Sequence, residues 1–205
     1  GNVDLNTQLT NSDVNGGVAG GKITLQAQNG SIKLNGSTDP TKQGAIIGKV
    51  LSTAADGTVT YEPVNFDLVM SATGNIEVNG SMYTSRDLNF QANSSGTGNG
   101  KVIFTTQPST AYASGNSAYR LDVVANNISF GTAKNAVTGL VVDTSKPTAI
   151  QTPGVAQQSG AKIMATDKME IYLKGGDIDL KSGNVTAVSN GGSTTSSSGI
   201  TLGGK

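Results

Sequence analysis

The segment Gly30-Ser31-Ile32-Lys33-Leu34-Asn35-Gly36 decides how this chain folds. Glycines bound it on both sides, and apolar residues alternate with polar ones between them. A period of two places Ile32 and Leu34 on one face of a strand and Lys33 and Asn35 on the other. A strand this short buries too little apolar surface to offset the entropy of ordering it, so it requires stacked copies of itself.

Copies of this unit recur along the chain. Each has the pattern Gly-x-apolar-x-apolar, where x is any residue. The clear copies begin at Gly1, Gly30, Gly74, Gly100 and Gly176. Looser copies lie at residues 128–130 and 200–202. Most copies follow one another after roughly 22–29 residues, and two gaps are about twice as long. This spacing is typical of repeat proteins, and it predicts one diverged copy inside each long gap.

A second alternating segment precedes most copies. These segments lie at residues 23–27, 66–70, 88–92, 121–125 and 169–173. A short turn separates the two segments in most repeats, for example at Asn126 and Asn127. Each repeat is then a strand, a tight turn, a second strand and a longer return, which predicts one coil of a parallel β-helix. The sequence predicts an all-β solenoid of about 8–9 coils, stacked ~4.8 Å apart, as a single domain over residues 1–205.

Stacked coils place equivalent side chains above one another. The expected internal apolar row contains Ile32, Ile76, Val102, Ile128 and Ile178. Burial of each of these side chains contributes roughly 1.5–3 kcal/mol. Asn35 and Asn79 occupy matching positions before a glycine, where Asn suits a turn and stacked amides bond along the axis.

Three stretches lack the repeat pattern. They lie near residues 37–63, 105–118 and 131–162, contain all five prolines, and are expected to be loop insertions. No segment has a helical stripe with caps, so we expect little helix. The chain starts directly inside a repeat, without a recognisable signal peptide, and neither end has an obvious polar cap. These features predict a segment of a longer filament.

The composition narrows the possible functions. The formal net charge is zero and only 14% of the residues are charged, which disfavours a nucleic-acid partner. No stretch approaches the ~20 apolar residues of a membrane span. Cysteine and histidine are absent, so disulfides, thiol chemistry and a histidine general base are absent as well. No cofactor or metal site is predicted.

The repeat units resemble those of filamentous haemagglutinin-like proteins. The resemblance is carried by Gly-Gly-Lys-Ile-Thr-Leu-Gln-Ala at 20–27, Gly-Asn-Ile-Glu-Val-Asn-Gly-Ser at 74–81 and Gly-Gly-Asp-Ile-Asp-Leu-Lys-Ser-Gly at 175–183. Those proteins are large bacterial adhesins exported by two-partner secretion. The resemblance implies a right-handed parallel β-helix, an outer-membrane transporter during export, and a secreted or cell-surface location. It also implies roles in attachment, aggregation or biofilm formation.

Catalysis is the main alternative, because many β-helix proteins are polysaccharide lyases or glycosidases. Asp177 and Asp179 are two residues apart on one predicted strand, so they share its outer face. Glycosidases use two carboxyl groups ~5–5.5 Å or ~6.5–9.5 Å apart, which such a pair can satisfy. The plainer interpretation is that both keep a solvent-facing surface polar. The same segment faintly resembles a calcium-binding nonapeptide but lacks its third glycine and its tandem repetition.

Tyrosines are the best candidates for ligand contact. Tyr112 and Tyr119 flank a loop of Ser, Gly and Asn, and they are the predicted ligand-contact residues. The sequence therefore favours a non-catalytic adhesin or structural stalk, whose partners are host or bacterial surface glycans or proteins, or further copies of itself. A carbohydrate-active enzyme and a self-assembling extracellular fibre subunit are the alternatives.

Overall fold

The computed structural model describes residues 1–7, 9, 20–35, 45–53, 59–105, 119–143, 159–181, 185–189 and 200–204. Within these residues the chain forms 17 strands, joined by turns and bends, and no helix. The predicted all-β class is confirmed. No described segment is a helix of the length and apolarity needed to cross a membrane.

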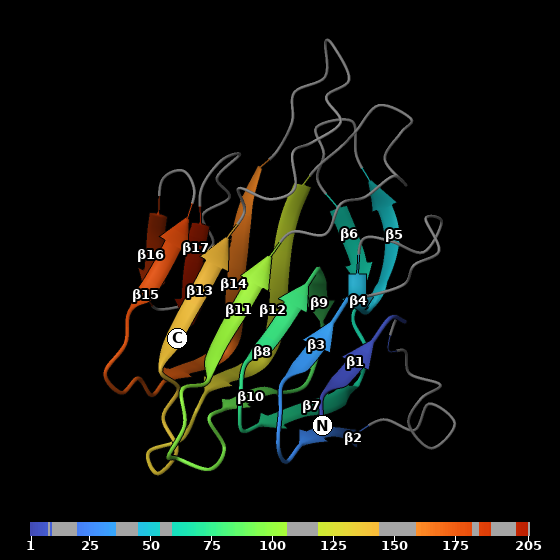
Figure 1. Ribbon diagram of the computed structural model, residues 1–205. Helices are drawn as coiled ribbons and strands as arrows, with labels where there is room; N and C mark the ends of the chain where they lie inside the picture. Colours follow the sequence, from blue (N-terminus) through green and yellow to red (C-terminus); the bar gives the residue numbers. More distant parts are fainter. Residues whose placement is uncertain are drawn as a thin grey trace.

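The first sheet has six strands, and every neighbouring pair in it is parallel. In spatial order it contains β1 (Val3–Leu5), β3 (Ile32–Leu34), β8 (Ile76–Asn79), β11 (Lys101–Thr105), β13 (Gly139–Asp143) and β15 (Ile178–Lys181). Figure 1 shows these strands side by side from blue to red, so spatial order follows chain order.

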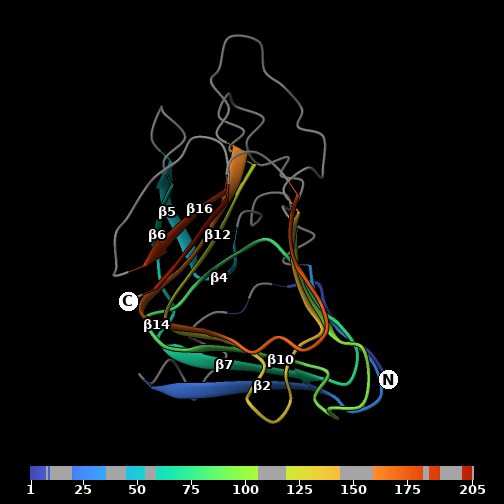
Figure 2. The same cartoon turned by 90° about the vertical axis from the view of Figure 1, so that its left-hand side faces the viewer.

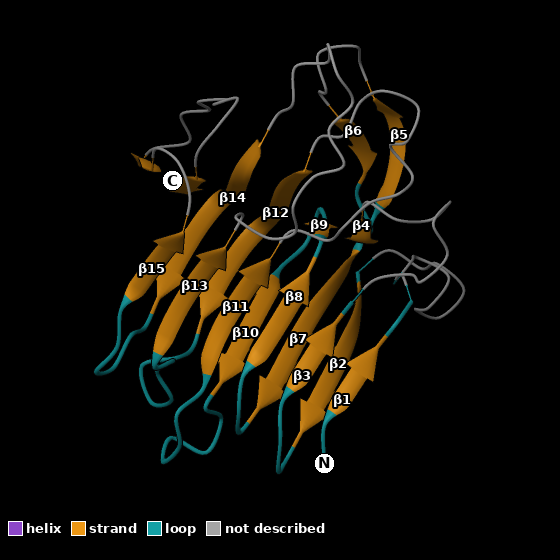
Figure 3. Ribbon diagram, turned by 45° about the horizontal axis from the view of Figure 1, so that its top comes forward, coloured by secondary structure: helices purple, strands orange, loops and turns teal. Residues whose placement is uncertain are grey.

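The second sheet has nine strands, and its pairs are also parallel. Its main path runs through β2 (Gly21–Ala27), β7 (Phe66–Ala72), β10 (Leu88–Ala92), β12 (Tyr119–Phe130), β14 (Ser159–Ile171), β17 (Ile200–Gly204) and β16 (Val185–Ser189). The strands β4 (Ala45–Ile47) and β9 (Ser81–Tyr83) join it beside β12. Figure 3 shows the strands of both sheets running across the molecule in two layers.

The second sheet turns a corner within β12. Val123 and Val124 in its first half pair with β9, and its last three residues pair with β10. The register towards β14 shifts between Ala125 and Asn127, where the sequence predicts a tight turn. The turn is instead an irregularity inside one continuous strand. Figure 2 looks along the stacking direction and shows β12 and β14 bending there, with β2, β7 and β10 along the lower edge.

The chain alternates between the two sheets. From β2 onward, β2, β7, β10, β12 and β14 of the second sheet are each followed by a strand of the first sheet. As far as β15, each return to the first sheet or to the main path of the second sheet adds one parallel neighbour to the previous strand there. β17 differs, because it lies between β14 and the earlier strand β16. This order explains why short segments repeat in the sequence: each one needs a previous copy to complete its backbone hydrogen bonds.

A continuous apolar row lines the inner face of the first sheet. The register aligns Val3, Ile32, Ile76, Val102, Leu140 and Ile178 on successive strands. The four middle members of the row are fully buried, whereas Ile178 on the last strand is 43% exposed. The predicted alignment of Ile32, Ile76, Val102 and Ile178 is confirmed.

The assignment of Ile128 to this row is wrong. Ile128 lies on the second sheet, where its neighbours are Leu88 and Met169. Leu140 occupies the expected place instead, because β13 interrupts the stretch predicted to be an insertion at 131–162. The prediction of a diverged copy between Ile32 and Ile76 is also wrong, because these two residues pair directly.

The predicted insertion near 37–63 holds β4 and a hairpin. The hairpin consists of β5 (Lys49–Thr53) and β6 (Val59–Glu62), which pair antiparallel and form a separate two-stranded sheet. Residues 106–118, which make up nearly all of the predicted insertion at 105–118, lie outside the described residues.

Aromatic side chains fill the space between the sheets. Phe90 and Phe130 come from neighbouring strands, and their rings stack with centroids 5.2 Å apart and planes 12° apart. Phe104 reaches in from the first sheet and meets both rings edge-on, at 5.2 and 6.0 Å. All three side chains are completely buried. They tie the two sheets together near the middle of the stack.

The repeated glycine has a physical reason. At Gly100, an added Cβ would lie 2.1 Å from Asn93 N and 2.7 Å from Gly74 O. At Gly176, it would lie 1.7 Å from Thr138 O. At these two positions successive turns therefore pass so close to one another that no side chain fits between them, and a glycine preserves the contact. The equivalent position before β13 is Thr138, so the glycine is not present in every repeat.

Candidate functional site

A polar surface lies on the outer face of three neighbouring strands of the second sheet. Leu88 and Ile128 point into the core, so the residues on either side of them point outward. The register aligns these outward residues in two rows across β10, β12 and β14. The first row is Asp87, Asn127 and Lys168, and the second row is Asn89, Ser129 and Glu170. We call these six residues the polar grid.

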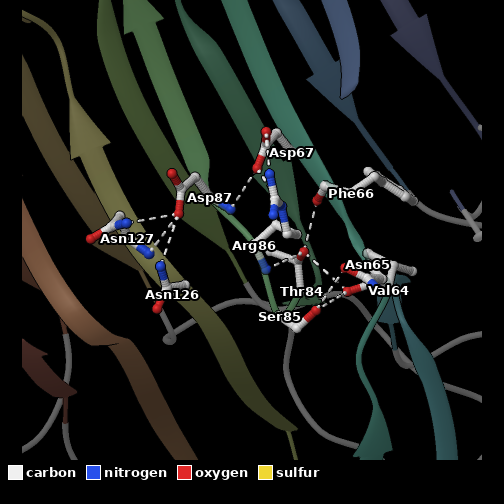
Figure 4. A network of polar contacts seen from close by, with 10 residues as sticks. All are labelled: Val64, Asn65, Phe66, Asp67, Thr84, Ser85, Arg86, Asp87, Asn126 and Asn127. Atoms are coloured by element: carbon white, nitrogen blue, oxygen red, sulfur yellow. Dashed lines mark hydrogen bonds and ion pairs between the residues drawn. The ribbon is translucent and has the colours of Figure 1, made fainter. Parts of the chain in front are cut away.

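The first row is held by hydrogen bonds that cross the strands. Asp87 Oδ1 accepts from Asn127 N at 3.1 Å, from Asn127 Nδ2 at 2.9 Å and from Asn126 Nδ2 at 3.4 Å. Lys168 N donates to Asn127 Oδ1 at 3.2 Å. Figure 4 shows both Asn side chains turned towards the same oxygen of Asp87. The Asp87 carboxylate is thereby fixed by neutral amide donors.

The network continues towards β7. Asp67 Oδ1 accepts from Asp87 N at 3.2 Å and from Arg86 Nε at 3.3 Å (Figure 4). Arg86 is therefore engaged in an ion pair with Asp67, and no described side chain forms an ion pair with Asp87. Thr84, which is 3% exposed, joins the backbone of β7 to the backbone at Arg86. Its hydroxyl donates to Phe66 O at 2.8 Å and accepts from Arg86 N at 3.0 Å.

The second row is ordered in a similar way. Ser129 Oγ donates to Asn89 Oδ1 at 2.6 Å. Lys168 Nζ lies 2.6 Å from Glu170 Oε1, and the Tyr172 hydroxyl donates to the same oxygen at 3.1 Å. The hydrogen bond from Lys168 lowers the pKa of the Glu170 carboxyl, and the same contact raises the pKa of Lys168. Both groups are charged at neutral pH.

The polar grid forms the floor of an open groove of about 450 Å³. Tyr172 and the segment 131–133 line one end of it. We call this surface the β10–β14 groove. Its volume falls within the ~300–1,000 Å³ range of small-molecule sites.

Several polar atoms of the groove remain available to form hydrogen bonds with a ligand. Among the described residues, nothing donates to Asp87 Oδ2 and nothing accepts from Asn89 Nδ2. The Lys168 side chain is 61% exposed, and its ammonium group keeps further protons for a ligand. The groove thus offers acceptors and donors that are already oriented by the sheet.

A second hollow lies on the outer face of the first sheet. It has a volume of about 550 Å³, and Lys101, Thr138, Asp177 and Asp179 are among its lining residues. Asp177 and Asp179 are both exposed, as the alternation predicts. Within the described part of the chain, no group of three or more Asp or Glu side chains is placed to hold a metal ion.

The predicted ligand-contact tyrosines are not brought together by the described structure. Tyr112 lies outside the described residues. Tyr119 begins β12, and its backbone pairs with Ser159 of β14. Another tyrosine of the sequence, Tyr172, lines the β10–β14 groove. Sequence reasoning missed the other groove residues because their signal appears only when outward positions of different repeats are aligned by register.

Comparisons with known proteins give no assignment. No protein-family model, no curated protein and no solved structure matches this chain.

Proposed function

We propose that this chain is a non-catalytic adhesin or structural stalk that mediates attachment at a bacterial surface, like the filamentous haemagglutinin-like proteins that its repeats resemble. The observation that carries the proposal is the first sheet, in which six parallel strands pair without a register shift. A chain built this way is rigid along its axis, since every strand is bonded to its neighbours. It also presents long outward faces on which equivalent residues are aligned.

In the same proposal, the two sheets are faces of one right-handed parallel β-helix. Support comes from the alternation of the chain between the sheets and from the parallel pairing of each first-sheet strand after β1 with the previous strand of that sheet. The six strands of the first sheet would mark six coils among the described residues. This number is smaller than the eight or nine coils counted from the sequence.

Attachment is tested with fluorescent beads that carry the purified chain. We expect saturable binding of these beads to bacterial or epithelial cells, and competition by the soluble chain. Beads that carry the heat-denatured chain are the control. Equal binding of native and denatured chains would reject the proposal. Release of reducing ends from neutral or acidic polysaccharides would favour the alternative of a carbohydrate-active enzyme.

Self-assembly is a second candidate, favoured by the end strands of the stack. Among the described strands β1 has a single neighbour in the first sheet, and its residues Val3 and Leu5 are only partly buried. β15, with the exposed Ile178, ends the same sheet on the other side. Exposed edges of this kind can pair with another chain. Sedimentation velocity over a range of concentrations tests this: growing species support a fibre subunit, and a constant monomer rejects it.

A further inference from the structure

We propose that the β10–β14 groove binds an uncharged oligosaccharide, with sugar hydroxyls bonded to the polar grid and a sugar ring against Tyr172. This inference deepens the proposed attachment function and rests on it. It assigns the ligand class and the residues that recognise it.

The hydrogen-bonding capacity of the groove matches a polyhydroxylated ligand. A sugar hydroxyl both donates and accepts a hydrogen bond. Asp87 Oδ2 is an available acceptor, whereas Asn89 Nδ2 and the Lys168 ammonium supply donors. A hydrogen bond to a carboxylate is stronger than one between neutral groups, so Asp87 is expected to be the main polar contact.

The groove is also organised in advance. Asp87 is fixed by the two Asn side chains and Ser129 by Asn89, so these groups lose little freedom when a ligand binds. The rows cross three strands that lie ~4.8 Å apart. An elongated ligand that lies across the strands would meet a new pair of polar side chains at each strand.

The charge of the groove selects an uncharged ligand over an anionic one. Lys168 is the only cation among the groove residues, and it is already paired with Glu170. Among the described residues no cation pairs with Asp87, because Arg86 pairs with Asp67 instead. A sulfated or carboxylated glycan would face this carboxylate without a free cation, so repulsion disfavours it.

Tyr172 supplies the apolar contact that sugars also require. Its hydroxyl is held by Glu170 Oε1, which fixes the ring at the end of the groove. A rigid aromatic ring offers a large contact area at a small cost in conformational entropy. The aliphatic face of a sugar ring can pack on it while the hydroxyls reach the grid.

The test uses the full chain on an array of neutral oligosaccharides of hexoses and N-acetylhexosamines, together with sialylated and sulfated glycans. We expect binding to members of the neutral set and none to the sulfated set. Titration of the ¹⁵N-labelled chain with the best neutral binder should shift the amide signals of Asp87, Asn127, Ser129 and Tyr172. Binding to no glycan, preference for sulfated glycans, or shifts elsewhere on the chain would overturn the proposal.

Three variants connect binding to the groove. Asp87→Asn keeps Oδ1 as an acceptor but removes the charge and the available oxygen, and it should weaken binding about tenfold. Tyr172→Ala should abolish binding, whereas Tyr172→Phe keeps the ring and should retain most of it. Glu77→Gln is the matched control, since it removes one partly exposed carboxylate from the first sheet. Unchanged affinity in Asp87→Asn and Tyr172→Ala would overturn the assignment.

The bead assay separates failure of this inference from failure of the proposed function. If Asp87→Asn and Tyr172→Ala attach to cells as the wild type does, the groove is not the attachment site and the stalk function stands. If wild-type beads do not attach to cells, the proposed function itself fails.

Discussion

Asn79 Nδ2 donates a hydrogen bond of 2.7 Å to Asn35 Oδ1, although the two residues are 44 positions apart in the sequence. Asn35 in turn donates to Asn6 at 2.9 Å, and the Thr105 hydroxyl donates to Asn79 Oδ1. This row of polar side chains follows the ends of β1, β3, β8 and β11. It confirms the predicted stacking of Asn35 on Asn79, and it favours the native register because a slip by one residue would break every one of these bonds.

We expect Asn79→Ala to destabilise the protein because it removes hydrogen bonds on both sides of the row. The expected loss in the free energy of unfolding is about 1–3 kcal/mol, measured by urea denaturation. Asn99→Ala is the control, since Asn99 is exposed and should change stability by less than ~0.5 kcal/mol. Equal effects of the two substitutions would show that the row does not contribute to stability.

The alternation of inner and outer residues predicts opposite results for two valines. Val78 is completely buried, whereas Val69 lies on the outer face of β7 and is only partly buried. We expect Val78→Ala to lower the free energy of unfolding by about 1–3 kcal/mol, because it removes buried methyl groups and leaves a cavity. Val69→Ala should cost less than ~1 kcal/mol. A larger effect at Val69 would contradict the assignment of the faces.

Alternation and glycine spacing were sufficient to predict the strands of the first sheet except β13, which lies in the stretch predicted to be an insertion at 131–162. Ile32, Ile76, Val102 and Ile178 are aligned as the repeats indicate. The position of Ile128 was not predictable in this way, because the same alternating pattern occurs on both sheets. Only the pairing of its neighbours Leu88 and Met169 shows which sheet it joins.

The candidate site was harder to predict than the fold. Asp87, Asn127 and Lys168 are far apart in the sequence, and none is part of a recognisable motif. They meet because β10, β12 and β14 are neighbours, with a register set partly by the irregularity after Ala125. Tyr172 is one of five tyrosines in the sequence, and no sequence pattern places it beside Glu170.

The close passage of turns predicts that Gly100→Ala is strongly destabilising. Its Cβ would overlap backbone atoms of Asn93 and Gly74, which cannot move aside as a flexible side chain would. We expect a loss of about 1–3 kcal/mol or more in the free energy of unfolding. At Gly1 an added Cβ would meet nothing within 4 Å, so Gly1→Ala is the control and should be neutral. A neutral result for Gly100→Ala would contradict the close stacking of the turns.

The contact between Lys168 and Glu170 predicts a measurable titration. The folded-state pKa of Glu170 lies below its ordinary value of 4.5. The contribution of this contact to stability is therefore present above that value and is lost as the pH falls through the folded-state pKa. For Lys168, whose pKa is raised above 10.5, the contribution is lost as the pH rises through the higher value.

The ¹³C carboxyl signal of Glu170 measures this directly. In the wild type, we expect its midpoint below the ordinary value, and in Lys168→Met we expect the midpoint to move up towards it. Lys33→Met is the control, since Lys33 pairs with Glu77 on the other sheet and should leave the Glu170 titration unchanged. An identical Glu170 midpoint in the wild type and in Lys168→Met would show that the contact does not form in solution.

The central claim is that distant repeats lie side by side in parallel register, and engineered disulfides test it most directly because the chain has no cysteine of its own. Lys33 and Glu77 are register partners on adjacent strands, and Ile103 pairs with Glu77 on the far side. Adjacent strands ~4.8 Å apart suit a disulfide, but second neighbours do not. Oxidation of the folded chain should therefore link the cysteines of the Lys33→Cys/Glu77→Cys variant and leave those of Lys33→Cys/Ile103→Cys free. Free thiols in the first variant, together with a disulfide in the second, would contradict the account.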